Sequence, residues 1–136
     1  MPSFHFQPPL VPGAVQFARR LTALSCGEAR LLVPLLSIAV GALVRVRVPA
    51  REVILARPNG EDLAAAISLH NILPGTIRAL GDDTARLATL VEVDIGGASL
   101  LARITPDAIT RLGLGPGAPV LALVKSMSVE VLPRLD

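Results

Sequence analysis

The spacing of proline and glycine is the feature that most limits what this chain can fold into. The 136 residues include 12 prolines and 11 glycines. In the segments between these residues, strand patterns recur. Residues 44–48 alternate strictly between valine and arginine, which is typical of a strand with one buried face and one face in water. Further strands are expected at residues 52–55, 75–80, 85–94, 99–104, 120–124 and 129–132, with turns at 81–83 and 95–97.

One short helix stands out between two of these strands. The Thr105 side chain can cap its first turn, Pro106 suits the first helical position, and Gly113 can end it. Many short strands joined by glycine and proline turns, with one or two short helices, predict a mainly β chain folded as a small β-barrel.

The chain also contains an internal repeat. Residues 12–16 match 74–78 at an offset of 62, residues 31–33 match 100–102 at 69, and residues 41–44 match 117–120 at 76. We interpret this as two related β-modules, about 13–57 and 72–136, in one domain covering 13–136. Chance similarity between apolar strands is the alternative. Residues 1–12 carry four prolines and are expected to be a disordered or linker-like lead-in.

Composition and motifs exclude several classes of protein. Apolar residues make up 51% of the chain, which excludes disorder, and Cys26 is the one cysteine, which excludes an intrachain disulfide. The longest uncharged apolar run, residues 31–44, is shorter than the roughly 20 residues a spanning helix needs. The N-terminal residues do not resemble a secretory signal. We therefore expect a soluble intracellular protein.

Enzyme motifs are missing from the sequence. It has no Walker or dinucleotide-binding loop, and the glycine-rich residues 113–117 precede a strand, so they are expected to form a turn. Ser68 and His70 lie two apart in an extended stretch and could not face each other as nucleophile and base. His5 is remote from His70, and no Cys/His cluster exists. We expect no enzyme, no metal and no cofactor.

A nucleic-acid partner is disfavoured. The chain has no Trp or Tyr, its three Phe fall within the first 17 residues, and its net charge is only +2. Proteins that bind single strands usually stack bases on aromatic side chains. An OB-type nucleic-acid binder using Arg45, Arg47, Arg51 and Arg57 is therefore kept only as a minor alternative.

A few groups remain that could bind an anion. Residues 68–71 place polar side chains two apart before a strand, and Thr105 caps the helix. Lys125, the only lysine, ends a long apolar strand and is followed by Ser126. Turn hydrogen bonding, helix capping and a solvated strand end are the alternative interpretations of these groups.

Several segments, taken in order, resemble the Mop (TOBE) oxyanion-binding module. They are residues 68–77, 101–105, 112–117 and 122–126, and residues 44–55 resemble the C-terminal domain of the ATP-binding subunit of molybdate importers. The resemblance implies an OB-like β-barrel built from two related halves. It also implies molybdate or tungstate as ligand, at Ser68, Thr105 and Lys125, with Ser126 and His70 beside them.

The resemblance further implies a cytoplasmic regulatory domain of a molybdate import ATP-binding subunit, without the ATPase domain in this chain. Its partners would be that ATPase domain and the membrane subunits, at the inner face of the membrane, and a homodimer is expected. Two departures weaken the site: the family usually has Arg at His70 and often a hydroxyl at Ala108. Binding only below about pH 6.5, when histidine is charged, is one consequence. A ligand-free dimerisation or structural module of the same fold is the alternative. Because Pro49 stands at the place of Lys125, any complete site is expected in the second copy.

Overall fold

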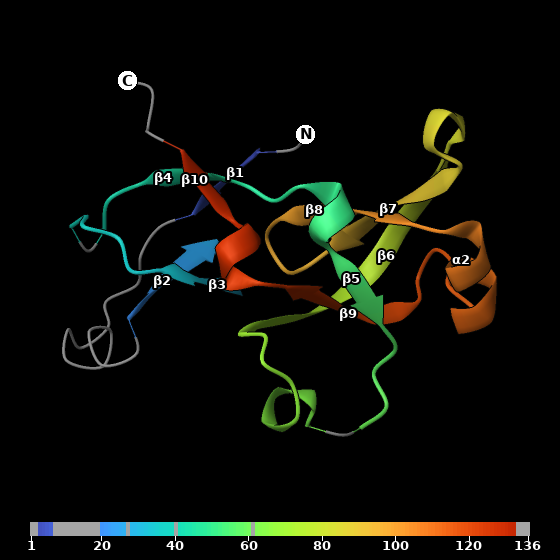
Figure 1. The fold of residues 1–136 in the computed structure, drawn as a ribbon, viewed down its shortest axis with the longest axis horizontal. Helices are drawn as coiled ribbons and strands as arrows, with labels where there is room; N and C mark the ends of the chain where they lie inside the picture. The colour runs from blue at the N-terminus through green and yellow to red at the C-terminus, as the bar shows by residue number, and fades with distance from the viewer. Residues whose placement is uncertain (1–2, 7–19, 27, 40, 61, 133–136) are drawn as a thin grey trace.

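The computed structural model describes residues 3–6, 20–26, 28–39, 41–60 and 62–132 (Figure 1). The repeat segment at 12–16 lies outside these residues. The strands are β1 (Ser3–Phe6), β2 (Leu21–Cys26), β3 (Ala29–Pro34), β4 (Val44–Arg47), β5 (Ile54–Ala56), β6 (Asn71–Asp83), β7 (Ala88–Asp94), β8 (Ser99–Ile104), β9 (Pro119–Val124) and β10 (Glu130–Leu132). The helix α2 spans Pro106–Leu112, and the 3-10 turns are η1 (Ala50–Glu52), η2 (Leu63–Ala65), η3 (Thr84–Arg86) and η4 (Ser126–Ser128).

The described strands form three antiparallel sheets. Five strands pair in the order β5-β9-β6-β7-β8, three in the order β1-β4-β10, and β2 pairs with β3 as a hairpin. Figure 1 shows α2 at one end of the five-stranded sheet and the two smaller sheets toward the other. The mainly β expectation is confirmed, although these sheets do not join into one closed sheet within the described ranges.

The internal repeat is visible in the strand register. At an offset of 76, η1 maps onto η4 and β5 onto β10. The pairing repeats too: Val46 lies opposite Val131, and Ala122, its counterpart, lies opposite Leu55. The last strand of each half therefore pairs with a strand of the other half: β5 pairs with β9, and β10 pairs with β4.

The two hairpins repeat in the same way at an offset of 69. Leu24 lies opposite Leu31 in the first, and Val93 lies opposite Leu100 in the second. All four side chains are almost completely buried in one core cluster to which both halves contribute. The strand pairing is thus similar in the two halves, and both halves contribute to a single apolar core. That the halves are two copies of one module stays a prediction.

The helix forms as expected. The Thr105 hydroxyl accepts a hydrogen bond from the Ala108 N–H at 3.1 Å, and Gly113 ends the helix with φ +63°. Ile109 and Leu112 pack against the core. None of the helices in the described part of the chain is both long and apolar enough to cross a membrane.

Three local expectations need correction. Residues 81–83, expected as a turn, continue β6, and the reversal occurs at η3, where Leu87 has φ +49°. β6 begins at Asn71 rather than at residue 75. Pro74 has no backbone N–H to donate, but it is tolerated within the strand because β6 pairs only with β9 at that point, and β7 pairs with β6 only from Thr76 onward. Part of the expected lead-in, Ser3–Phe6, forms β1 and pairs with β4.

Candidate functional site

A pocket of about 220 Å³ opens where β6 begins and β9 ends. Its lining residues are Ser68, Leu69, His70, Lys125, Ser126 and Met127. Four of these are among the site residues expected from sequence: Ser68, His70, Lys125 and Ser126. The structure therefore brings together groups that lie more than fifty positions apart in the chain.

The β6–β9 ladder explains why these groups meet. Its end pair is Asn71 opposite Val124. His70 immediately precedes this pair on one strand, and Lys125 immediately follows it on the other. The chain then turns into η4, which buries Ser126 and leaves Met127 exposed. The pocket thus lies directly beyond the last rung of the ladder.

Asn71 anchors this end of the ladder. Its side chain is 1% exposed, accepts a hydrogen bond from the Leu32 N–H at 2.6 Å and donates one to the Leu32 carbonyl at 2.8 Å. The sequence left two interpretations of Asn71 open, an anion-binding role and a local turn hydrogen bond. Its amide joins β6 to β3 of the other half.

The pocket has the chemistry of an anion site. Ser68 and Ser126 supply hydroxyls, His70 supplies ring N–H groups, and Lys125 supplies an ammonium. The lining residues include no Asp or Glu. Within the described ranges, none of the ion pairs involves Lys125 or His70. An anion entering the pocket would therefore meet cationic groups without a carboxylate competitor.

Thr105 is not part of this pocket. It follows β8, the edge strand on the far side of β6 and β7, and its hydroxyl caps α2. In Figure 1, α2 lies well away from η4. The structure therefore separates Thr105 from the other four expected site residues, and its ligand role stays a prediction.

The place related to the pocket by the repeat lacks its polar groups. At the offset of 76, Lys125 corresponds to Pro49 and Ser126 to Ala50, and both of these residues are buried. η1 packs against β8 just as η4 packs against β3. Lys125, Ser126 and Met127 of the pocket therefore belong to the second copy, and Ser68, Leu69 and His70 directly precede it.

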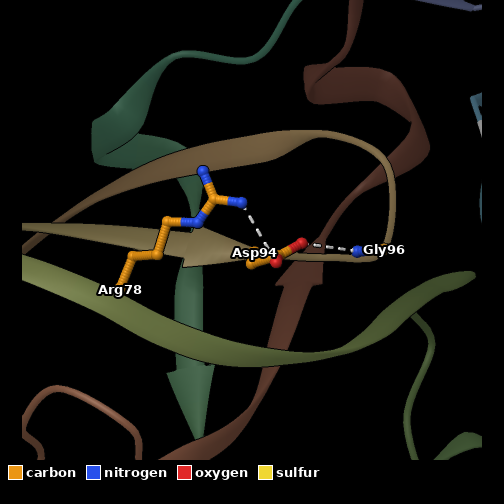
Figure 2. A network of polar contacts seen from close by, with 3 residues as sticks. All are labelled: Arg78, Asp94 and Gly96. Atoms are coloured by element: carbon orange, nitrogen blue, oxygen red, sulfur yellow. Dashed lines mark hydrogen bonds and ion pairs between the residues drawn. The ribbon is translucent and has the colours of Figure 1, made fainter.

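A polar network at the β7–β8 turn has a structural role (Figure 2). The Asp94 carboxylate accepts hydrogen bonds from the Gly96 N–H at 2.9 Å and from the Arg78 guanidinium at 3.2 Å. The hydrogen bond from Gly96 has the largest effect and lowers the pKa of Asp94; burial opposes it, and the hydrogen bond and charge of Arg78 lower it further. The Gly96 carbonyl accepts from the Glu28 and Ala29 N–H groups, which ties the two hairpin turns together.

A second pocket of about 480 Å³ lies in the segment after β3. It is lined by residues 35–39, and Leu35 and Ile38 are each about two-fifths exposed. Sequence reasoning did not single out this pocket, because residues 31–44 were considered only as a candidate membrane segment. Elsewhere in the described chain, no group of three or more His, Cys, Asp and Glu residues could hold a metal ion.

Comparisons with solved structures support the fold. A crystal structure of the cytoplasmic molybdate-binding protein ModG, in a form with molybdate bound, superposes with a TM-score of 0.72 at 24% identity. The match covers 96% of this chain and 94% of the other. The expected OB-like fold is therefore confirmed.

Comparisons of sequence point to one group of proteins. The chain is 45% identical to the molybdenum import ATP-binding protein ModC of Granulibacter bethesdensis over 84% of its length, which is 32% of that relative. It is 39% identical to ModC of Mesorhizobium japonicum over 81% of its length, which is 28% of that relative. The chain thus spans about a third of the length of these relatives. All six pocket residues fall within residues 67–131, which match the TOBE domain family, and this part of the chain is therefore a TOBE domain.

Proposed function

We propose that this chain binds molybdate or tungstate and serves as the regulatory domain of a molybdenum import ATP-binding protein. The observation that carries the proposal is the pocket in which Ser68, His70, Lys125 and Ser126 converge. The similarity to ModC proteins and the fold shared with ModG support it. TOBE domains are non-catalytic, and no reaction step is assigned to this chain.

The chemistry of the pocket suits a tetrahedral dianion. Such an ion needs several hydrogen-bond donors and a compensating positive charge, and charge-assisted hydrogen bonds are roughly twice as strong as neutral ones. Lys125 supplies the permanent charge, and the hydroxyls of Ser68 and Ser126 supply neutral donors. No resident cofactor is proposed, because the oxyanion itself is the ligand.

Thr105 would enter the site from another copy of the chain. Thr105 lies too far from the pocket of its own chain to line it, but it is exposed at the start of α2. We propose a homodimer in which this residue approaches the partner's pocket. The proposed domain covers residues 13–136, because the exchanged strands β5 and β10 make each half incomplete without the other.

The setting follows from the relatives. We propose that the domain works in the cytoplasm, at the inner face of the membrane, together with the ATPase domain and membrane subunits of a transporter. Binding of the oxyanion to this domain would make the activity of that ATPase depend on the oxyanion concentration in the cytoplasm.

A ligand-free dimerisation module is the second candidate. It is favoured by the exposed apolar side chains of Leu35, Ile38 and Leu43, which lie close together in sequence after β3. Apolar groups gathered on a surface often mark a protein contact. This module would self-associate whether or not oxyanion is present.

Calorimetric titration with molybdate, tungstate and sulfate separates these candidates. We expect saturable binding of molybdate or tungstate that Lys125→Ala abolishes and Ser126→Ala weakens. Arg111→Ala is the matched control, because it removes one positive charge from exposed α2, away from the pocket. An absence of binding heat, with an unchanged melting temperature, would leave the dimerisation module as the better account.

A further inference from the structure

We propose that the pocket takes up a proton together with its anion, and that His70 carries that proton. This inference rests on the proposed function, because it concerns the same site. Its consequence is regulatory: the domain would hold oxyanion more tightly as the surrounding pH falls.

The strand register places His70 next to the permanent charge. β6 and β9 end on the pair Asn71 and Val124. His70 precedes Asn71 and Lys125 follows Val124, so both residues stand at the same end of the ladder. Both residues line the pocket, so one bound anion can contact both.

The pocket around His70 holds no carboxylate. Its six lining residues include no Asp or Glu, and Lys125 is the other basic residue among them. The acidic residues of β6 and β7 lie from the Thr76–Asp94 pair onward, five or more positions along the ladder from Asn71. They are Asp82, Asp83, Glu92 and Asp94. Glu130, two residues beyond η4, pairs with Arg47, and β3, which packs against η4, contributes Arg30.

This arrangement makes protonation and anion binding depend on each other. A dianion held between His70 and Lys125 attracts a positive charge on the imidazole, so binding of the anion and binding of the proton favour each other. Histidine changes charge between about pH 5 and 8, so the effect falls in the physiological range. Linkage limits the gain in affinity to about tenfold per pH unit for one proton.

The test measures proton uptake directly. Molybdate is titrated into the full chain at pH 6.5 in two buffers that differ in ionisation enthalpy, and the difference in heat gives the protons taken up per anion. We expect a value between zero and one, together with tighter binding at pH 6 than at pH 7.5. His70→Gln should lose the proton uptake and the pH dependence, and His70→Arg should bind with equal affinity at both pH values.

His5→Gln is the matched control, because His5 is the other histidine of the chain and lies on β1. It should behave like the unmodified protein. Molybdate binding without proton uptake, or uptake that persists in His70→Gln, would overturn this inference and leave the proposed function standing. No binding at either pH would overturn both.

Discussion

The Asn71 side chain forms both of its amide hydrogen bonds with the backbone of a single residue, Leu32. The Leu32 N–H donates to Asn71 Oδ1 at 2.6 Å, and Asn71 Nδ2 donates to the Leu32 carbonyl at 2.8 Å. The amide thus acts like one more strand residue between β6 and β3, which belong to different halves. It holds in place the segment that carries Ser68 and His70.

Replacing this amide should destabilise the fold. Asn71→Ala leaves the Leu32 N–H and carbonyl without partners in a buried place, and an unsatisfied buried group costs about 1–3 kcal/mol. We expect a lower free energy of unfolding by that amount in urea titrations, with an unchanged m value. Asn71→Asp keeps the acceptor but loses the donor and buries a carboxylate beside the Leu32 carbonyl, so it should destabilise the fold more than Asn71→Ala. A stability equal to that of the unmodified protein would contradict this role.

Gly75 and Gly81 lie on the same strand but differ in the space around them. A Cβ on Gly75 would approach the Asp94 carbonyl oxygen and a Val93 methyl carbon to 2.7 Å, whereas a Cβ on Gly81 meets nothing within 4 Å. Gly75→Ala should therefore cost about 1–3 kcal/mol through overpacking. Gly81→Ala is the matched control and should be neutral or stabilise by up to about 1 kcal/mol. Thermal melts of the two variants should rank in that order.

Asp94 should make stability depend on acid pH. The Gly96 N–H and then Arg78 hold its pKa below the ordinary 3.8 in the folded state. A carboxyl with a lowered folded-state pKa binds its proton more readily when unfolded. Its contribution is complete above pH 3.8 and is lost as the pH falls through the lowered value.

The Asp94→Asn variant tests this contribution. Melting temperatures recorded between pH 7 and pH 2.5 should fall less steeply below pH 4 for the variant than for the unmodified protein. Asp107→Asn is the control, because Asp107 is highly exposed and pairs only with Arg111 on the same helix. Parallel curves for the unmodified protein and Asp94→Asn would show that the network does not contribute in this range.

The exchange of strands predicts that a cut between the halves leaves them together. A protease site introduced at Gly60, in the exposed link between β5 and β6, separates the halves covalently. Because β5 remains paired with β9 and β10 with β4, the cut chain should elute from gel filtration as one particle. Urea should release two fragments. Two separate species under native conditions would contradict the shared core.

Local features of this chain could be read from its sequence. The alternation at residues 44–48 predicted β4, and the signals at Thr105, Pro106 and Gly113 predicted α2. Helix capping and strand alternation involve residues that are close in sequence, so the local sequence pattern is enough to predict these elements. The repeat offset of 76 also relates η1 to η4 in the structure, although the sequence did not predict that these segments form 3-10 turns.

The tertiary structure alone decided which strands pair and which site residues meet. Nothing near β5 or β10 indicates that each pairs with the other half, because that pairing depends on burying one core between both modules. The same long-range packing gathered Ser68, His70, Lys125 and Ser126 into one pocket and left Thr105 on α2. The sequence gives the order of the donors and charges along the chain. The distances between them depend on how the sheets pack around their shared apolar core.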